Sequence, residues 1–195
     1  MCRDQDLSRD LDAQLNQSPG RENDVSQLPA QTVATPADFV VIGEVGCGKT
    51  ALVNALLQTG AAPRKTQSAE FHSHNVIDTP GEFVGRRTYY GALLATMVDV
   101  ATIVYLQAAN SHLFSLPAGV LTVYPGKQLV GVISKIDLAD ADIDAARRVL
   151  RDNGIPEPYF ETSAVTRAGI EQLSTHLLGL QQGAAKKANR GRGVA

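Results

Sequence analysis

The sequence has no tryptophan, only two cysteines and an aromatic content of 5% among its 195 residues. Cys2 and Cys47 are too few for a disulfide-stabilised scaffold, and this cysteine usage fits a reducing, cytoplasmic environment. The chain is long enough for one domain with its own apolar core plus terminal extensions, and its hydrophobic content of 44% is ordinary for a globular protein. We therefore expect one globular domain without a disulfide framework.

The sequence also lacks a strong charge of one sign, because its formal net charge is −2. A globally basic nucleic-acid-binding protein is therefore not indicated. The charge is unevenly distributed: residues 1–37 carry six acids and three bases, whereas residues 183–195 carry four bases and no acid. We interpret residues 1–37 as a leader and residues 183–195 as a basic tail, and we predict that both are disordered.

Long hydrophobic runs are missing as well. The N-terminus is acidic and has no apolar segment of the signal-peptide kind. The longest apolar stretch, residues 91–109, is interrupted by Asp99 and predicts a helix end followed by a strand rather than a membrane span. In the leader, Leu7, Leu11 and Leu15 recur at helical spacing, so residues 6–16 are either part of a disordered segment or a short amphipathic helix that folds on a partner.

One glycine-rich octet organises the rest of the chain. It fits the phosphate-binding pattern G-x-x-x-x-G-K-[ST] and consists of Gly43, Glu44, Val45, Gly46, Cys47, Gly48, Lys49 and Thr50. Residues 39–42 before it predict a buried strand, and Ala51 begins a predicted helix after it. In this context backbone N–H groups and the helix N-terminus bind phosphate, Lys49 reaches the β- and γ-phosphates, and the Thr50 hydroxyl binds Mg²⁺.

A second motif, Asp78-Thr79-Pro80-Gly81, follows a short strand predicted at residues 75–77. The pattern D-x-x-G is common by itself, but here it ends an apolar strand 28 positions after Thr50, where a γ-phosphate sensor is expected. We predict that Asp78 holds Mg²⁺ through a water molecule and that the Gly81 N–H faces the γ-phosphate.

Two further motifs predict recognition of guanine. Ser134-Lys135-Ile136-Asp137 follows a predicted buried strand at residues 129–133 and resembles [NT]-K-x-D, with serine in the first position. A carboxylate at Asp137 can accept hydrogen bonds from guanine N1–H and the 2-amino group, whereas adenine offers neither in that geometry. The loop Thr162-Ser163-Ala164 matches a pattern that offers a backbone N–H to guanine O6.

The order of these motifs predicts an α/β fold of the P-loop NTPase class: a Ras-like, three-layer αβα domain around a mostly parallel sheet, over residues 38–182. We also expect a helix over residues 82–97, a short helix near residues 118–122, a helix from Ile143 that stops at Asn153-Gly154, and a closing amphipathic helix from Ile170 to Leu180. The short separation of Thr50 and Asp78 predicts a shortened switch I region.

Beyond the general fold, the core resembles the EutP/PduV family, which is linked to ethanolamine and propanediol utilisation in bacterial microcompartments. The resemblance spans about residues 38–181. It is carried by Cys47-Gly48-Lys49-Thr50, Lys65-Thr66-Gln67, Asp78-Thr79-Pro80-Gly81-Glu82, Arg86-Arg87, Tyr90, Ala92-Leu93, Lys135-Ile136-Asp137-Leu138, Thr162-Ser163-Ala164 and Gly169-Ile170-Glu171-Gln172-Leu173.

The resemblance implies a GTPase that binds GTP or GDP with Mg²⁺ and is cytoplasmic at or in a microcompartment. The leader departs from the family pattern, and its leucine stripe is the segment that would dock a shell or cargo protein. It implies that Thr66 is the switch threonine that contacts Mg²⁺ and the γ-phosphate, and that Leu138 belongs to the base-binding loop. Glu82 occupies the position that usually holds a water-orienting glutamine, which predicts slow unaided hydrolysis. Alternatively, Glu82 points away and pairs with Arg86 four residues on.

Two other functions stay open from the sequence. Members of the ethanolamine branch are also described as acetate kinases, although no acetate pocket is evident in the sequence, and His72 and His74 are either phosphoryl acceptors or exposed residues of an edge strand. The third interpretation is a non-catalytic scaffold that docks a shell protein.

Cys47, at a helix N-terminus, is either a reactive thiolate or a small side chain that fills the loop.

Overall fold

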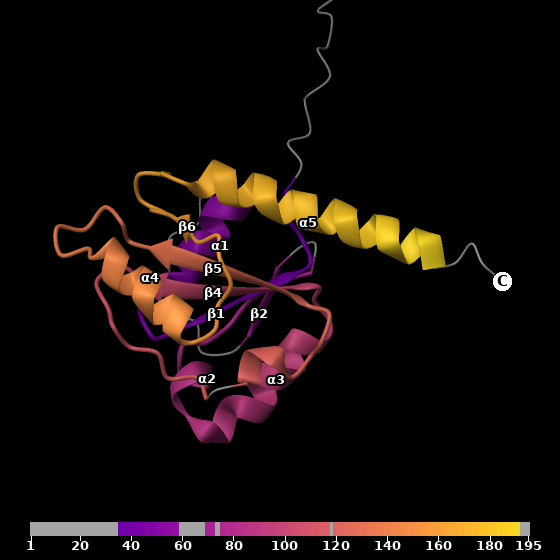
Figure 1. Cartoon of the computed structure of the whole chain (residues 1–195), viewed down its shortest axis with the longest axis horizontal. Coiled ribbons are helices and arrows are strands. Elements are labelled where there is room, and N and C mark those ends of the chain that lie inside the picture. The colour runs from indigo at the N-terminus through magenta and orange to yellow at the C-terminus, as the bar shows by residue number, and fades with distance from the viewer. Residues whose placement is uncertain (1–34, 59–68, 73–74, 118, 192–195) are drawn as a thin grey trace, which may run out of the picture. The chain divides into compact units, whose positions relative to one another are not determined.

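The computed structural model describes residues 35–58, 69–72, 75–117 and 119–191, with the backbone alone for residues 185–191 (Figure 1). The leader up to residue 34 lies outside the described residues, and so do Thr66 with the region of the predicted shortened switch I, and His74.

Within the described residues the strands form one six-stranded sheet in the order β2-β3-β1-β4-β5-β6. All neighbours pair in parallel except β2 and β3, which are antiparallel, so the predicted mostly parallel sheet is confirmed. The strands are β1 (Phe39–Gly43), β2 (Glu70–His72), β3 (Val76–Asp78), β4 (Thr102–Ala108), β5 (Gln128–Ser134) and β6 (Phe160–Glu161).

The central strands are buried along their whole length because helices or loops cover both faces of the sheet. Every residue of β1 and every residue of β4 is buried. The described helices are α1 (Lys49–Leu57), α2 (Glu82–Gly85), α3 (Tyr90–Val98), α4 (Ile143–Asp152) and α5 (Ile170–Gly191), with 3₁₀ turns η1 (Arg87–Tyr89) and η2 (Val120–Thr122).

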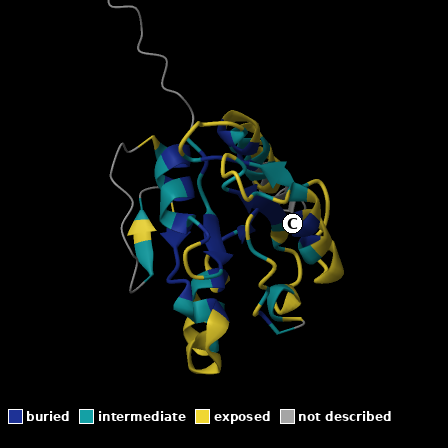
Figure 2. Cartoon of the chain, turned by 90° about the vertical axis from the view of Figure 1, so that its left-hand side faces the viewer, coloured by how far each residue is buried: buried dark blue, intermediate teal, exposed yellow. Residues whose placement is uncertain are grey.

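Two apolar clusters, one on each face of the sheet, make the three layers. On one face, Leu52 and Leu56 of α1 and Leu173 and Leu177 of α5 pack together with the strands. On the other face, Leu93 and Met97 of α3 and Ala146 and Leu150 of α4 pack together with the strands. Figure 1 shows α1 and α5 above the sheet and α2 and α3 below it, and Figure 2 shows the buried sheet between them. The predicted α/β architecture of the P-loop NTPase class is thus confirmed.

The continuous helix that we predicted over residues 82–97 is wrong. The structure breaks this segment into α2, η1 and α3, and Arg86 between them has an extended backbone with φ −131° and ψ 121°. Gly85 ends α2, and glycine is a poor residue for propagating a helix because it loses much backbone entropy. Arg86 is therefore not on the same helix as Glu82.

Two other boundaries differ from the sequence-based expectation. The short helix near residues 118–122 is a 3₁₀ turn, η2, so no α-helix is described between β4 and β5. The backbone of α5 continues to Gly191, beyond the expected start of the tail at residue 183, because alanine and lysine dominate residues 184–189 and favour helix. The helix α4 ends at Asp152 before Asn153, as predicted. No described helix is both long and apolar enough to span a membrane.

Candidate functional site

The sequence-predicted site residues that are described lie in loops at the carboxyl ends of the strands. The phosphate loop follows β1, Asp78 ends β3, Lys135 follows β5, and Thr162 follows β6. In open parallel sheets this edge is where ligands bind, because the βα loops and helix N-termini meet there. The fold therefore brings the four motifs to one edge of the sheet.

The phosphate loop is held open by its backbone. Gly46 and Gly48 have φ values of 77° and 99°, and, apart from each glycine and its chain neighbours, no atom of the described residues lies within 4 Å of the position where a Cβ would stand. A side chain would be strained at these φ angles and would occupy that open space. The helix α1 begins directly after Gly48, has no side-chain cap, and has no acidic residue in its first turn, which includes Thr50 and Ala51. The N–H groups in the first turn of a helix have no intrahelical partner and suit the binding of an anion.

Lys49 is a buried ammonium beneath this loop, with only 6% of its surface exposed. Its Nζ donates to the carbonyl oxygens of Gly43 at 3.1 Å and Glu44 at 2.9 Å. A buried charge without such partners would be costly. The carbonyl groups of the loop therefore fix the ammonium at the loop before any ligand binds, which favours the binding of phosphate.

Thr50 and Asp78 connect the phosphate loop to the end of β3. The Thr50 hydroxyl donates to Asp78 Oδ2 at 2.5 Å, and Asp78 is fully buried. The next residue, Thr79, is also fully buried, and its hydroxyl donates to the carbonyl oxygen of Val41 in β1 at 2.7 Å. These two hydrogen bonds fix the start of the D-x-x-G segment against β1 and α1, with one hydroxyl and one carboxylate side by side.

The end of the D-x-x-G segment lies directly against the phosphate loop. A Cβ added to Gly81 would stand 2.5 Å from Val45 Cα and 2.7 Å from Val45 N, so only glycine allows this approach. Val45 itself is 56% exposed at the mouth of the loop. Glu82, the first residue of α2, is half-buried. The structure thus places Gly81 and Glu82 beside the loop, as the sequence suggested.

The two base-recognition loops also lie side by side. The Ile136 N–H donates to the carbonyl oxygen of Thr162 at 3.4 Å, and the Thr162 N–H donates to the carbonyl oxygen of Ile133 at 2.7 Å. Lys135 has a positive φ of 60°, which turns the chain sharply after β5. Asp137 and Leu138 follow on the exposed side of this turn. The Asp137 carboxylate makes no hydrogen bond within the described residues and is accessible to a ligand.

The second loop is fixed from inside the protein. Ser163 is fully buried, its hydroxyl accepts from the Thr166 N–H at 3.0 Å, and its N–H donates to the carbonyl oxygen of Ala168 at 3.0 Å. Ala164 beside it is half-buried. Because the Ser163 N–H is used inside the loop, it is not available to a ligand, whereas the Ala164 N–H makes no hydrogen bond within the described residues.

A hydrogen bond that the sequence analysis did not predict joins the two halves of the site. The Ser134 hydroxyl, at the end of β5, donates to the carbonyl oxygen of Cys47 in the phosphate loop at 2.7 Å. Serine thus supplies a direct bond even though it replaces the usual asparagine or threonine. The motif position was visible in the sequence, but the partner, 87 residues away, was not.

Another contact that sequence reasoning missed starts at Glu44. Its Oε1 accepts from the Ser115 N–H at 2.8 Å, which fastens the loop after β4 to the phosphate loop. The rings of Phe114 and Tyr105 pack against each other with centroids 4.7 Å apart. Burial, with smaller contributions from Glu44 and Cys47, raises the pKa of the Tyr105 phenol. No local sequence signal links Glu44 to a residue 71 positions later.

The reactive residues considered from the sequence have structural roles or lie apart. Cys47 is 2% exposed, and burial raises the pKa of its thiol despite the opposing effect of Lys49, so it is a small side chain that fills the loop rather than a thiolate. His72 pairs with Val76, at the opposite end of β3 from Asp78. The strand register therefore does not bring His72 to the D-x-x-G segment.

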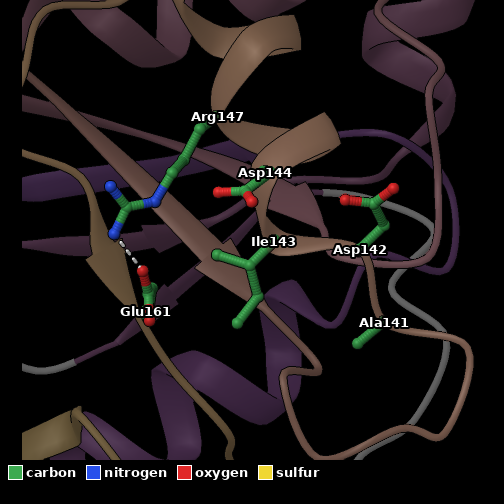
Figure 3. A pocket seen from close by; sticks show the side chains of 6 residues that line it. All are labelled: Ala141, Asp142, Ile143, Asp144, Arg147 and Glu161. Atoms are coloured by element: carbon green, nitrogen blue, oxygen red, sulfur yellow. Dashed lines mark hydrogen bonds and ion pairs between the residues drawn. The ribbon is translucent and has the colours of Figure 1, made fainter.

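A separate surface hollow of about 700 Å³ lies beside the start of α4 (Figure 3). Two of its acidic side chains already have partners: Asp142 caps α4 by accepting from the Ala145 N–H at 2.8 Å, and Glu161 pairs with Arg147. The hollow is lined by Ala141, Asp142, Ile143, Asp144, Arg147 and Glu161. These contacts explain its charged residues by helix capping and ion pairing, and we assign it no ligand.

The strand order, the glycine loop at the end of β1 and the buried Lys49 define a P-loop NTPase fold of the Ras-like kind. Comparison with known proteins agrees. The model of the family PduV-EutP, described as "Ethanolamine utilisation - propanediol utilisation", matches residues 37–178. The chain belongs to this family.

Similar proteins of known name come from enteric bacteria. The chain is 43% identical over 141 residues to "Probable acetate kinase EutP" of Salmonella typhimurium, which covers 72% of this chain and 89% of that protein. It is 41% identical over 139 residues to the protein of the same name from Escherichia coli K12, covering 71% and 87%. It is 30% identical over 136 residues to "Propanediol utilization protein PduV" of Citrobacter freundii, covering 69% and 89%.

Proposed function

We propose that this protein binds GTP with Mg²⁺ and hydrolyses GTP slowly. The observation that carries the proposal is the direct connection of the phosphate loop to the base loops through the Ser134–Cys47 hydrogen bond of 2.7 Å. A nucleotide has a base at one end and phosphates at the other, so a single nucleotide would contact both connected loops. Asp137 favours guanine as that base, because its carboxylate matches two adjacent donors.

The residues of the phosphate loop suit a nucleotide–Mg²⁺ complex. Lys49 and the N–H groups of the first turn of α1 would bind the phosphates, and the Thr50 hydroxyl with Asp78 would hold the ion, Asp78 through water. Bound Mg²⁺ would neutralise charge that develops on the phosphates. In nucleotide sites Mg²⁺ usually takes most of its ligands from water and phosphate oxygens.

Nucleotide titration of the full chain tests the choice of base. We expect GTP to bind more tightly than ATP, and Asp137→Asn to weaken GTP and improve xanthosine triphosphate, whose donor pattern suits an amide. Asp140→Asn is the matched control, because Asp140 lies in the same loop but accepts from Asn110 Nδ2 at 3.1 Å. Equal binding of GTP and ATP by the wild type would contradict the assignment of guanine.

We propose that GTP hydrolysis is slow because of Glu82. A carboxylate can accept a hydrogen bond from the attacking water, but when ionised it cannot donate toward the γ-phosphate, and its charge repels that group. Glu82→Gln should therefore raise single-turnover GTP hydrolysis, whereas Glu82→Ala should not. Equal rates in all three forms would assign the positioning of water to another group.

A second candidate function is phosphoryl transfer to or from acetate, because two of the relatives carry the name "Probable acetate kinase EutP". Release of phosphate from nucleotide with and without acetate, together with detection of acetyl phosphate, separates the two functions. Nucleotide-dependent acetyl phosphate formation that Lys49→Ala abolishes would favour the kinase. Nucleotide binding without either reaction would favour a scaffold.

We also propose that the protein acts at or in a bacterial microcompartment in the cytoplasm. The support is the family description, which names ethanolamine and propanediol utilisation. The family match begins at residue 37, so residues 1–36 lie outside it and are candidates for binding a shell or cargo protein.

A further inference from the structure

The outer face of α3 differs from that of α4 on the same side of the sheet. The exposed residues of α4 include Asp144, Arg147, Arg148, Arg151 and Asp152, which is the usual surface of a solvated helix. The exposed residues of α3 are Gly91, Ala92, Ala95 and Val98, and α3 has no charged side chain at all. Figure 2 shows the exposed outer side of this helical segment at the bottom of the view.

The apolar outer face of α3 extends to its neighbours in the chain. Tyr89, which precedes α3, is 40% exposed, and Val98 at its end is 51% exposed. Leu93 and Met97 already supply the contacts with the core, so the outer face is not needed for packing against the sheet. A helix that is apolar on all sides is normally covered on all sides.

The charges at the two ends of α3 indicate what covers it. Arg86 and Arg87 lie just before α3 and Asp99 lies just after it, and all three are exposed. Within the described residues Arg87 and Asp99 make no ion pair. Both charges are at the unfavourable end of their own helix, because the helix dipole favours anions at the N-terminus and cations at the C-terminus. At the C-terminal end the Lys127 ammonium, which donates to the carbonyl oxygen of Val98 at 2.7 Å, already offsets part of this effect.

We propose that this face binds the same face of a second copy of the chain, with the two α3 helices antiparallel about a two-fold axis. In that arrangement Arg87 lies near the C-terminus of the second α3, and Asp99 lies near its N-terminus, so both unfavourable dipole interactions become favourable. The small side chains of Ala92 and Ala95 let the helices approach closely at the axis.

The spacing along the helix matches this arrangement. Measured from the midpoint between Ala92 and Ala95, Arg87 lies about 10 Å toward the N-terminus and Asp99 about 8 Å toward the C-terminus, from the rise of α- and 3₁₀-helices. An antiparallel second copy therefore places its Asp99 opposite Arg87, twice in each dimer. Surface ion pairs contribute little affinity, so this pairing sets the orientation, and the apolar face supplies the association.

The expected dimer is of the transient class, because a nine-residue helix offers a small contact area. The test is sedimentation velocity of the full chain, without nucleotide, at about 1 to 100 µM, a range suited to micromolar dissociation constants. We expect a concentration-dependent dimer, weakened at least about tenfold by Ala95→Glu, which would place an unpaired charge at the axis. Ala95 is exposed and glutamate is a good helix former, so the variant should fold, which its thermal unfolding will verify.

Charge exchange tests the antiparallel orientation. Arg87→Asp alone and Asp99→Arg alone should each weaken the dimer, and the double variant should restore it, because the exchanged charges again attract. Arg148→Asp on the outer face of α4 is the matched control and should leave the dimer unchanged. A wild type that stays monomeric throughout this range, a dimer insensitive to Ala95→Glu, or a double variant weaker than both single variants would each overturn the proposal. None of these outcomes depends on nucleotide binding, so a result that contradicts the dimer does not contradict the proposed binding and hydrolysis of GTP.

Discussion

Lys49 illustrates how one residue serves structure and ligand binding at once. Its ammonium donates to two carbonyl groups of the phosphate loop, and the described chain has a second lysine, the half-buried Lys127, that also donates to two carbonyl groups but lies far from the loop. Lys127 Nζ donates to the carbonyl oxygens of Val98 at 2.7 Å and Val100 at 2.5 Å. The two residues therefore form a matched pair for separating the structural contribution from the binding contribution.

We predict that Lys49→Ala and Lys127→Ala each reduce the free energy of unfolding by about 1–3 kcal/mol, because each removes a charged donor from two carbonyl groups. Only Lys49→Ala should lower nucleotide affinity, by about 2–5 kcal/mol, the cost of truncating one partner of a buried charge contact. Urea unfolding and nucleotide titration of both variants check this. Normal GTP affinity of Lys49→Ala would mean that the phosphate-loop assignment is wrong.

Two buried acids near the site predict a loss of stability at alkaline pH. Burial raises the pKa of the Cys47 thiol above its ordinary value of 9.0 and that of the Tyr105 phenol above 10.0. The folded protein therefore keeps these protons at pH values where the unfolded chain releases them. Their contribution to stability is complete below about pH 9 and falls as the pH rises further, by at most about 1.4 kcal/mol per pH unit for each group.

Urea unfolding between neutral pH and pH 10.5 measures this decline, and Cys47→Ala and Tyr105→Phe should each make it shallower. The Tyr105 hydroxyl is buried without a hydrogen-bond partner, so Tyr105→Phe should be close to neutral for stability at pH 7. A decline equally steep in the double variant would assign it to other groups.

For individual residues, the sequence predicted where the site residues lie in the fold better than it predicted which residues they contact. Motifs such as Asp78-Thr79-Pro80-Gly81 are local, and their spacing relative to strands is enough to place them on the carboxyl edge of the sheet. The bonds from Ser134 to Cys47 and from Ser115 to Glu44 join residues 87 and 71 positions apart. Nothing local specifies such partners, because they depend on which strands become neighbours.

At the scale of elements, the approach of the D-x-x-G segment to the phosphate loop predicts an asymmetry between two glycines. Gly81→Ala would bring its Cβ within 2.5 Å of Val45 Cα, a backbone atom that no rotamer change can move away, so one of the two segments must shift. We expect a loss of affinity for GTP that exceeds the loss for GDP, because the displaced Gly81 N–H is predicted to contact the γ-phosphate.

Gly85→Ala is the control, because its Cβ would point into open space at the end of α2. This variant should be neutral or slightly stabilising, since alanine favours helix over glycine by about 1 kcal/mol. To test whether Gly81 senses the γ-phosphate, the affinities of both variants for GDP and for a non-hydrolysable GTP analogue are measured. If Gly81→Ala kept the wild-type ratio of the two affinities, Gly81 would not be the γ-phosphate sensor.

Among the elements, the sequence predicted the buried strands well, because short apolar runs of this length are typical of buried strands rather than of helices. It failed at residues 82–97, where apolar periodicity continues across the break at Arg86. In the connection from β4 to β5 it predicted only a short helix near residues 118–122, which is a 3₁₀ turn. There, side chains of an irregular loop, including Phe114, Val120 and Leu121, cover the sheet in place of an α-helix, and no periodic pattern records that kind of cover.

At the scale of the whole molecule, the proposed nucleotide site and the proposed docking segment are separable. All site residues that the structure describes lie between Gly43 and Ala164, within the family match. We predict that deletion of residues 1–34 leaves GTP affinity unchanged but disperses the protein from microcompartments. Fluorescence microscopy of tagged proteins and nucleotide titration measure the two effects.

A full-length variant with Leu7→Glu, Leu11→Glu and Leu15→Glu is the matched control for the deletion. It should also disperse, because it removes the proposed apolar stripe without shortening the chain. Unchanged localisation of both proteins would leave the leader without this role and would favour docking through the folded domain.

The central position of β1 also bears on how the protein is made. Phe39 pairs with Thr102, 63 positions later in the chain, and with Val76 on its other side. At about 5–20 residues per second, the ribosome needs roughly 3–13 s to synthesise this intervening stretch. For an interval of that length after it emerges, the apolar run Phe39-Val40-Val41-Ile42 lacks its partner strand β4, and a chaperone can bind it. Because the Ala164 loop is synthesised last among the site loops, nucleotide can bind a complete site only after nearly the whole domain has left the ribosome.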